Sequence, residues 1–260
     1  MRKFYRLLNY EVSENIIPLI LICIGKIVIS LISIQIALEK PNNWVKRYED
    51  FYLSSGCIII FTMALIGIFG LCIKSLYSNY FGSKGIYTLL TLPVKREYIY
   101  FSRFCAFLIY FLALFAAEII TAFTGYKLFT SYITRYPWML QDEGRYLLTN
   151  GLFLAFIRSD FFRIILPLGI ESLIYSFSIL ISVVSGLYYA FICERSSRYW
   201  GILLIGIALV ILIRGIVYPI THTSGLDRYI SKYIYSIPLI VFSVIFMLNS
   251  IKLLKRGAIT

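Results

Sequence analysis

The sequence predicts an all-α integral membrane protein with six transmembrane helices, from its composition and from its apolar runs. Hydrophobic residues make up 60% of the 260-residue chain and charged residues only 15%, whereas soluble domains average about 25% charged residues. So few charges cannot cover a surface that faces water. Apolar runs of the roughly 20 residues that a helix needs to cross the hydrocarbon core recur along the whole chain. Helix is expected for each run, because an isolated strand would leave backbone groups unsatisfied in lipid.

Six segments have this length, and they form a single membrane domain, 1–260. The second contains GCIIIFTMALIGIFGLCI and the fourth contains SLIYSFSILISVVSGLYYAFIC, both without a charged residue. The six expected spans are about 16–38, 56–76, 101–125, 168–192, 199–216 and 236–253.

The distribution of charge favours a cytoplasmic location for both ends of the chain (N-in, C-in). With that orientation, the inner segments hold 13 Lys or Arg against 4 Asp or Glu, and the outer loops hold 10 against 7. Lys and Arg near the ends of spans are retained on the cytoplasmic side. A basic face beside anionic lipid explains the net charge of +12 without nucleic acid.

Residues 1–15 are expected to form an amphipathic helix that lies in the inner interface before the first span. A frayed basic tail is the alternative. The expected apolar face is Phe4, Leu7, Leu8 and Val12, and the basic side chains that can reach phosphates are Arg2, Lys3 and Arg6.

The outer loops differ in character. The insertion 126–167 contains LLTNGLFLAFI (147–157), which is apolar but too short to span, so one or two helices are expected at the outer surface. They form either a lid at an exit or a packed cap. In the other outer loop, 217–235, the lone histidine His222 is expected to be solvated or satisfied by a neighbour.

Four charges lie inside the expected spans: Lys26, Glu118, Glu171 and Arg214. A central lysine costs about 2.5–3.5 kcal/mol on insertion scales, so Lys26 should face a partner, a cavity or a dimer seam. Either glutamate can pair with Arg214, which lies at similar depth. Such charges serve as structural ion pairs or as a polar lining of a translocation path.

No metal site is expected. The five cysteines lie in or beside apolar runs without CxxC spacing, and one histidine is too few for a zinc site. Small, buried hydrophobes are the simpler role for these cysteines. They are Cys23, Cys57, Cys72, Cys105 and Cys193.

The loop 77–100 contains a short amphipathic element, GIYTLLTLPVKREY. Ser83 can cap a helix whose apolar face is Ile86, Leu89 and Leu90. Pro93 favours a break before it and can begin the helix that leads into span three. Burying each apolar side chain contributes roughly 1.5–3 kcal/mol, so the face should dock on lipid or in a protein groove.

The pattern in this loop resembles the segment after span two in ABC-2-type transporter permeases. In that family the segment contains a coupling helix that sits in a cleft of a separate ATPase subunit. The layout is similar along the whole chain, whereas the motif covers about fifteen residues. The outer insertion lies between spans three and four, while many family members carry it before the last span. The matching residues are Gly85, Thr88, Leu89, Leu90, Leu92, Pro93, Val94, Arg96 and Ile99.

The resemblance implies a permease subunit of a bacterial cell-membrane exporter, itself not an enzyme. A P-loop is absent, so ATP and Mg belong to the partner ATPase, of which two copies are expected. Membrane lipid and a second permease chain, identical or related, are the other partners. The implied substrate is an amphipathic peptide, an antimicrobial or a lipid-like compound. The implied ATPase-coupling residues are Lys84, Gly85, Ile86, Thr88, Leu89, Leu90, Leu92, Pro93, Arg96 and Glu97.

Two other classes remain as alternatives. An intramembrane protease or lipid transferase needs facing acid, base, nucleophile or metal groups, and the isolated Glu118 and Glu171 do not suggest them. An immunity protein, receptor or channel would act without ATP and would form no stable ATPase complex.

Overall fold

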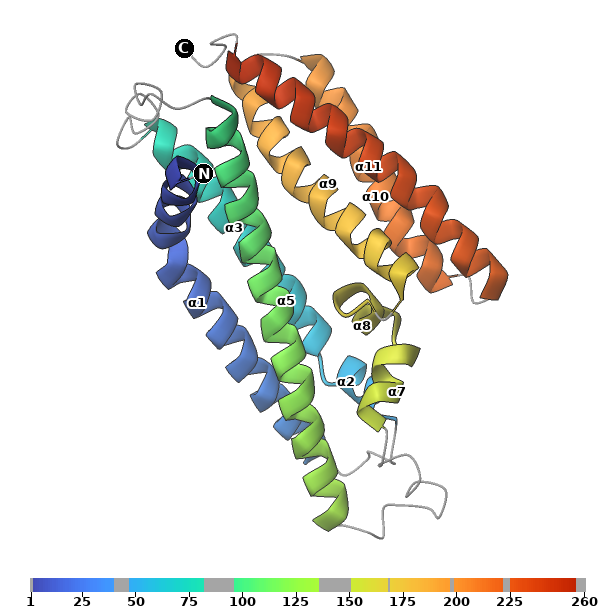
Figure 1. Cartoon of the computed structure of the whole chain (residues 1–260). Coiled ribbons are helices and arrows are strands. Elements are labelled where there is room, and N and C mark those ends of the chain that lie inside the picture. The colour runs from blue at the N-terminus through green and yellow to red at the C-terminus, as the bar shows by residue number, and fades with distance from the viewer. Residues whose placement is uncertain are drawn as a thin grey trace. The chain divides into compact units, whose positions relative to one another are not determined.

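The structure, a computed structural model, describes residues 2–39, 47–81, 96–135, 151–167, 169–196, 199–221 and 225–255 (Figure 1). All regular secondary structure in these ranges is α-helical. Within these ranges, six helices are long and apolar enough to cross a membrane, which matches the number of predicted spans and fits a multi-pass membrane protein. They are α1 (Arg2–Leu38), α3 (Cys57–Phe81), α5 (Arg96–Arg135), α9 (Ile170–Arg195), α10 (Tyr199–Thr221) and α11 (Gly225–Lys255).

The described ranges also contain three short helices: α2 (Tyr48–Ser54), α7 (Gly151–Arg158) and α8 (Asp160–Ile165). Two acidic residues, Glu49 and Asp50, occupy the first turn of α2, where the helix dipole favours negative charge. The Ser159 hydroxyl caps α8 by accepting a hydrogen bond from the Phe162 N–H.

The chain divides into two compact units, and three helices contribute to both. Unit 1 comprises Met1–Ile17, Leu71–Tyr110 and Gly169–Thr260. Unit 2 comprises Pro18–Gly70 and Phe111–Leu168. The dividing positions fall inside α1, α3 and α5, so each of these helices has one segment in each unit.

In unit 1, α9, α10 and α11 pack together (Figure 1). The rings of Tyr189 and Phe246 stack at 5.0 Å between α9 and α11. The Tyr175 hydroxyl of α9 donates to the Gly215 carbonyl of α10 at 2.5 Å. Buried serines recur every seventh residue on α11, and small side chains let helices in lipid approach closely. These serines are Ser236, Ser243 and Ser250.

In unit 2, the short helices bury side chains in one core with α1 and α5. Phe156 of α7 and Phe162 of α8 lie in the same cluster as Tyr48 and Tyr52 of α2. The predicted insertion 126–167 therefore supplies buried core, which favours the packed cap over the lid.

The segment 1–15 is helical in its described part but is not a separate interfacial helix. It is continuous with the first span through Pro18. Its Leu7 is buried against Ile99 of α5, so part of the face expected to lie on lipid packs on protein instead. The prediction missed this because residues on α5 far along the chain supply the contact.

The predicted outer loop 217–235 is mostly helical. Helix α10 continues to Thr221 and α11 already begins at Gly225. Helix α5 likewise extends beyond its predicted end, to Arg135. Polar residues in these extensions hid the helices from a search for apolar runs. His222 lies outside the described residues.

Helix α10 approaches α9 closely at Gly201. A Cβ at this position would lie 2.2 Å from the Cys193 sulfur and 3.0 Å from the Tyr189 hydroxyl. Both residues are buried, so neither can move aside freely. At Gly206, farther along α10, a Cβ would meet open space.

We predict that Gly201→Ala lowers the free energy of unfolding by about 1–3 kcal/mol, because the added methyl group overpacks the α9–α10 contact. Gly206→Ala should instead stabilise the helix by up to about 1 kcal/mol. Thermal unfolding in detergent measures both. Adding Cys193→Ala to Gly201→Ala should recover most of the loss. Equal stability of the two glycine variants would contradict the close approach.

Candidate functional site

The structure brings two of the four intramembrane charges together. Lys26 of α1 and Glu118 of α5 form an ion pair inside unit 2, with both side chains almost completely buried. Glu118, one of the two glutamates that could pair with Arg214, pairs with Lys26 instead.

The other two charges lie in unit 1. Glu171 lies in the first turn of α9. Arg214 is exposed on α10 and forms no salt bridge with any described residue.

Lys26 has a second partner on α5. Its Nζ donates to the Thr121 hydroxyl at 2.9 Å, and that hydroxyl donates to the Ala117 carbonyl at 2.8 Å. Glu118 and Thr121 are three residues apart and so lie on one face of α5. This face provides Lys26 with a carboxylate and a hydroxyl at the same depth, which offsets the loss of its hydration.

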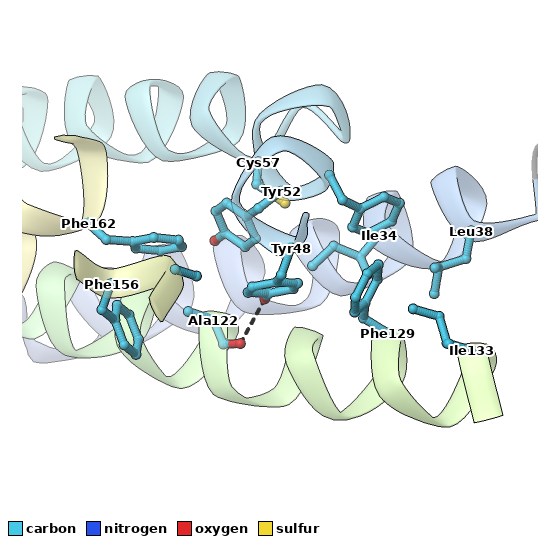
Figure 2. Packing of buried hydrophobic residues seen from close by; sticks show 12 residues of the cluster. Ile34, Leu38, Tyr48, Tyr52, Cys57, Ala122, Phe129, Ile133, Phe156 and Phe162 are labelled. Carbon is cyan, nitrogen blue, oxygen red and sulfur yellow. Dashed lines mark hydrogen bonds between the residues drawn. The ribbon is translucent and has the colours of Figure 1, made fainter. Parts of the chain in front are cut away.

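Two tyrosines of α2 donate hydrogen bonds to the same stretch of α5. The Tyr52 hydroxyl donates to Glu118 Oε1 at 2.5 Å. The Tyr48 hydroxyl donates to the Ala122 carbonyl at 2.8 Å (Figure 2). The tyrosines are four residues apart on α2, and their acceptors are four residues apart on α5. The two hydrogen bonds are therefore spaced by one helical turn on both α2 and α5, and the two helices run in opposite directions.

Burial raises the pKa of both tyrosine hydroxyls well above its ordinary value, and the nearby Glu118 carboxylate adds to the shift. Tyr48 and Tyr52 therefore keep their protons at physiological pH. Both remain hydrogen-bond donors to α5.

An aromatic core surrounds this polar network (Figure 2). The Tyr52 ring lies 5.0 Å from Phe162, and the Tyr48 ring lies 5.4 Å from Phe129. These rings exclude water, so each hydrogen bond within the network is strengthened and each missing partner would be costly.

The end of α2 is fixed as well. The Ser33 hydroxyl of α1 donates to the Ser55 carbonyl at 2.5 Å. Gly56 then turns the chain into α3 with φ of 81°, a left-handed conformation that favours glycine after a helix. The polar network thus joins α1, α2 and α5.

A second set of contacts anchors the helices on both sides of residues 82–95. Before this segment, the Tyr77 hydroxyl of α3 donates to Glu194 of α9 at 2.5 Å. After it, Arg96 Nη1 donates to the last carbonyls of α11, Leu254 at 2.8 Å and Lys255 at 3.0 Å. Arg96 thereby satisfies backbone groups that a helix end leaves without partners.

Glu97 and the following turn of α5 add further contacts within unit 1. Glu97 pairs with Lys255 of α11 at 2.5 Å, an exposed pair that contributes little stability. Tyr98 makes an edge contact with Phe4 of α1.

A buried ion pair lies one turn beyond the Leu7–Ile99 contact on both α1 and α5. Arg103 Nε donates to Glu11 Oε1 at 2.8 Å. The start of α1 is therefore bound to α5 by charge as well as by the Leu7–Ile99 contact.

Of the predicted coupling residues, the structure describes Arg96 and Glu97. The others lie outside the described residues: Lys84, Gly85, Ile86, Thr88, Leu89, Leu90, Leu92 and Pro93.

The sequence analysis missed the contributions of α2 and of Glu11. The spacing of Tyr48, Phe51 and Tyr52, with two acidic residues in the first turn, was a usable signal for a short helix with a buried face. The Glu11–Arg103 pair had no local signal, because its partners lie on different helices.

Comparisons of the chain with protein-family models, curated proteins and solved structures gave no match.

We predict strong coupling between Lys26 and Glu118. Replacing one partner, as in Lys26→Met or Glu118→Leu, should cost about 3–5 kcal/mol because it leaves an uncompensated buried charge. The double variant should be destabilised by much less than the sum of the single variants. The free energy of unfolding in mixed micelles measures this cycle, with Lys127→Met, an exposed lysine on the same α5, as the control. Additive effects would contradict the pairing.

Proposed function

We propose that the chain is the permease subunit of an ATP-driven exporter and that residues 82–95 couple it to a separate ATPase. The observation that carries this proposal is the anchoring of both flanks of that segment. Tyr77 connects the preceding helix to α9, and Arg96 connects the following helix to α11. Displacement of the segment would therefore act on four helices of unit 1.

The sequence of the segment supports the same role. The apolar face expected from the spacing of Ile86, Leu89 and Leu90 would dock in a groove of the ATPase. Lys84, Gly85 and Thr88 would lie toward its rim, and Leu92 and Pro93 would form the bend into α5. Arg96 and Glu97 would pass the movement on to α11, because both contact its last turn.

The proposal includes an orientation and a location. Both chain ends and residues 82–95 lie on the cytoplasmic side of a bacterial cell membrane, in line with the excess of Lys and Arg in those segments. The region 126–167 and α2 then lie toward the outer face. Within this arrangement, Lys26 and Glu118 hold the outer core together and do not line the path.

The proposed assembly has two ATPase copies and two permease chains. The substrate class that suits its apolar helices is an amphipathic peptide, an antimicrobial or a lipid-like compound. ATP and Mg bind to the ATPase, and this chain contributes coupling and half of the path.

Co-purification from membranes with the ABC ATPase encoded beside it tests the proposal. We expect a stable complex with the wild-type chain. Ile86→Asp/Leu89→Asp should reduce recovery of the ATPase at least about tenfold, because each buried apolar side chain contributes roughly 1.5–3 kcal/mol.

The matched control is Tyr87→Asp/Thr91→Asp, which adds the same charge to the opposite side of the expected helix and should keep the complex. Membrane insertion of each variant is checked by protein level in the membrane fraction. A wild-type chain that recovers no ATPase, or a complex that tolerates Ile86→Asp/Leu89→Asp, would overturn the proposal in favour of an ATP-independent membrane protein.

A further inference from the structure

Exposed cations gather where α1 and α5 begin and α11 ends, a region that we call the terminal corner. Among the described residues of these turns, the carboxylate is Glu97, and it pairs with Lys255. The neighbouring Glu11 is buried and pairs with Arg103. The exposed cations of the terminal corner are Lys3 and Arg6 of α1, Arg96 of α5, and Lys252 and Lys255 of α11.

Contacts between the three helices hold the terminal corner together. Arg96 reaches the last carbonyls of α11, so the start of α5 lies beside the end of α11 (Figure 1). Leu7 packs against Ile99, so the start of α1 also lies on α5. All of these residues belong to unit 1, so the gathering of cations is a property of one compact body.

The cations share helix faces with large exposed apolar side chains. On α11, Lys252 lies one turn after Leu248, which is 63% exposed. On α1, Arg6 lies one turn before Tyr10, which is 53% exposed. On α5, Tyr98 and Phe101 are exposed within two turns of Arg96. Arg96 and Lys252 thus lie at the ends of exposed apolar strips on membrane-length helices, whereas on α1 the exposed Glu14 follows Tyr10 by one turn.

We propose that the terminal corner is a binding site for anionic phospholipids. The apolar strips would contact acyl chains, the tyrosines would lie at the level of the headgroups, and Arg6 and Lys252 would contact the phosphates. This arrangement suits a lipid better than a soluble acidic protein, because a protein docking from the aqueous side would leave the sideways-facing apolar strips uncovered. The inference is independent of coupling to an ATPase.

Lipid retention by the full chain tests this site. The purified protein is delipidated in detergent, titrated with phosphatidylglycerol or phosphatidylcholine, and analysed by native mass spectrometry. We expect the wild-type chain to retain phosphatidylglycerol more tightly than phosphatidylcholine. Arg6→Gln/Lys252→Gln should weaken phosphatidylglycerol binding about thirtyfold, or about fivefold for each cation. The charge-conserving Arg6→Lys/Lys252→Arg should restore binding and show that the fold is intact.

The matched control is Lys127→Gln/Arg135→Gln, which removes two exposed cations from the segment of α5 in unit 2. This control should retain phosphatidylglycerol like the wild-type chain. Equal retention of the two lipids by the wild type, an equal loss in the control, or no loss in Arg6→Gln/Lys252→Gln would overturn the proposal. Displacement of phosphatidylglycerol by millimolar inorganic diphosphate would likewise overturn it and would assign the corner to soluble anions.

Discussion

A charged side chain in the middle of an apolar helix must find its counter-charge inside the protein, and in unit 2 that constraint centres on Lys26 and Glu118. A membrane offers no water to either group, so α1 and α5 must pack in the one register that brings them together. Tyr52 then adds a third helix, because its hydroxyl donates to the same carboxylate. The polar pair thus determines where α2 lies, and the aromatic core fills the space around it.

The same constraint acts in unit 1, at the start of α5. Glu11 and Arg103 neutralise each other between α1 and α5. Arg96 satisfies carbonyls at the end of α11 that would otherwise lack partners. These polar contacts join the start of α5 to α1 and to the end of α11. The cations that remain exposed at the same corner are available to lipid.

The sequence predicted the six spans because each is an apolar run whose length matches the hydrocarbon thickness. It failed where helix formation depends on distant contacts. Helix α2 has few apolar residues in a row, and its burial depends on acceptors at Glu118 and Ala122. The start of α1 was expected to lie free in the interface because its partner, Ile99, is remote in the chain.

The candidate site was predicted in part. Hydropathy alone identified Lys26 and Glu118 as charged residues inside expected spans, where charges are rare. Predicting that they pair with each other requires knowing how α1 and α5 are rotated about their axes. Composition does not determine this rotation. The apolar face of Ile86, Leu89 and Leu90 stays a prediction, because those residues lie outside the described ranges.

Hydrogen exchange of α2 in lipid nanodiscs tests the central claim most directly, namely that the Lys26–Glu118 pair holds this short helix in place. We expect the amides of Tyr48–Ser54 to be protected in the wild-type chain and to exchange far faster in Lys26→Met. The amides of α9 and α11 should be equally protected in both proteins, since they belong to unit 1. Rapid exchange of α2 in the wild type, or protection unchanged by Lys26→Met, would contradict the account.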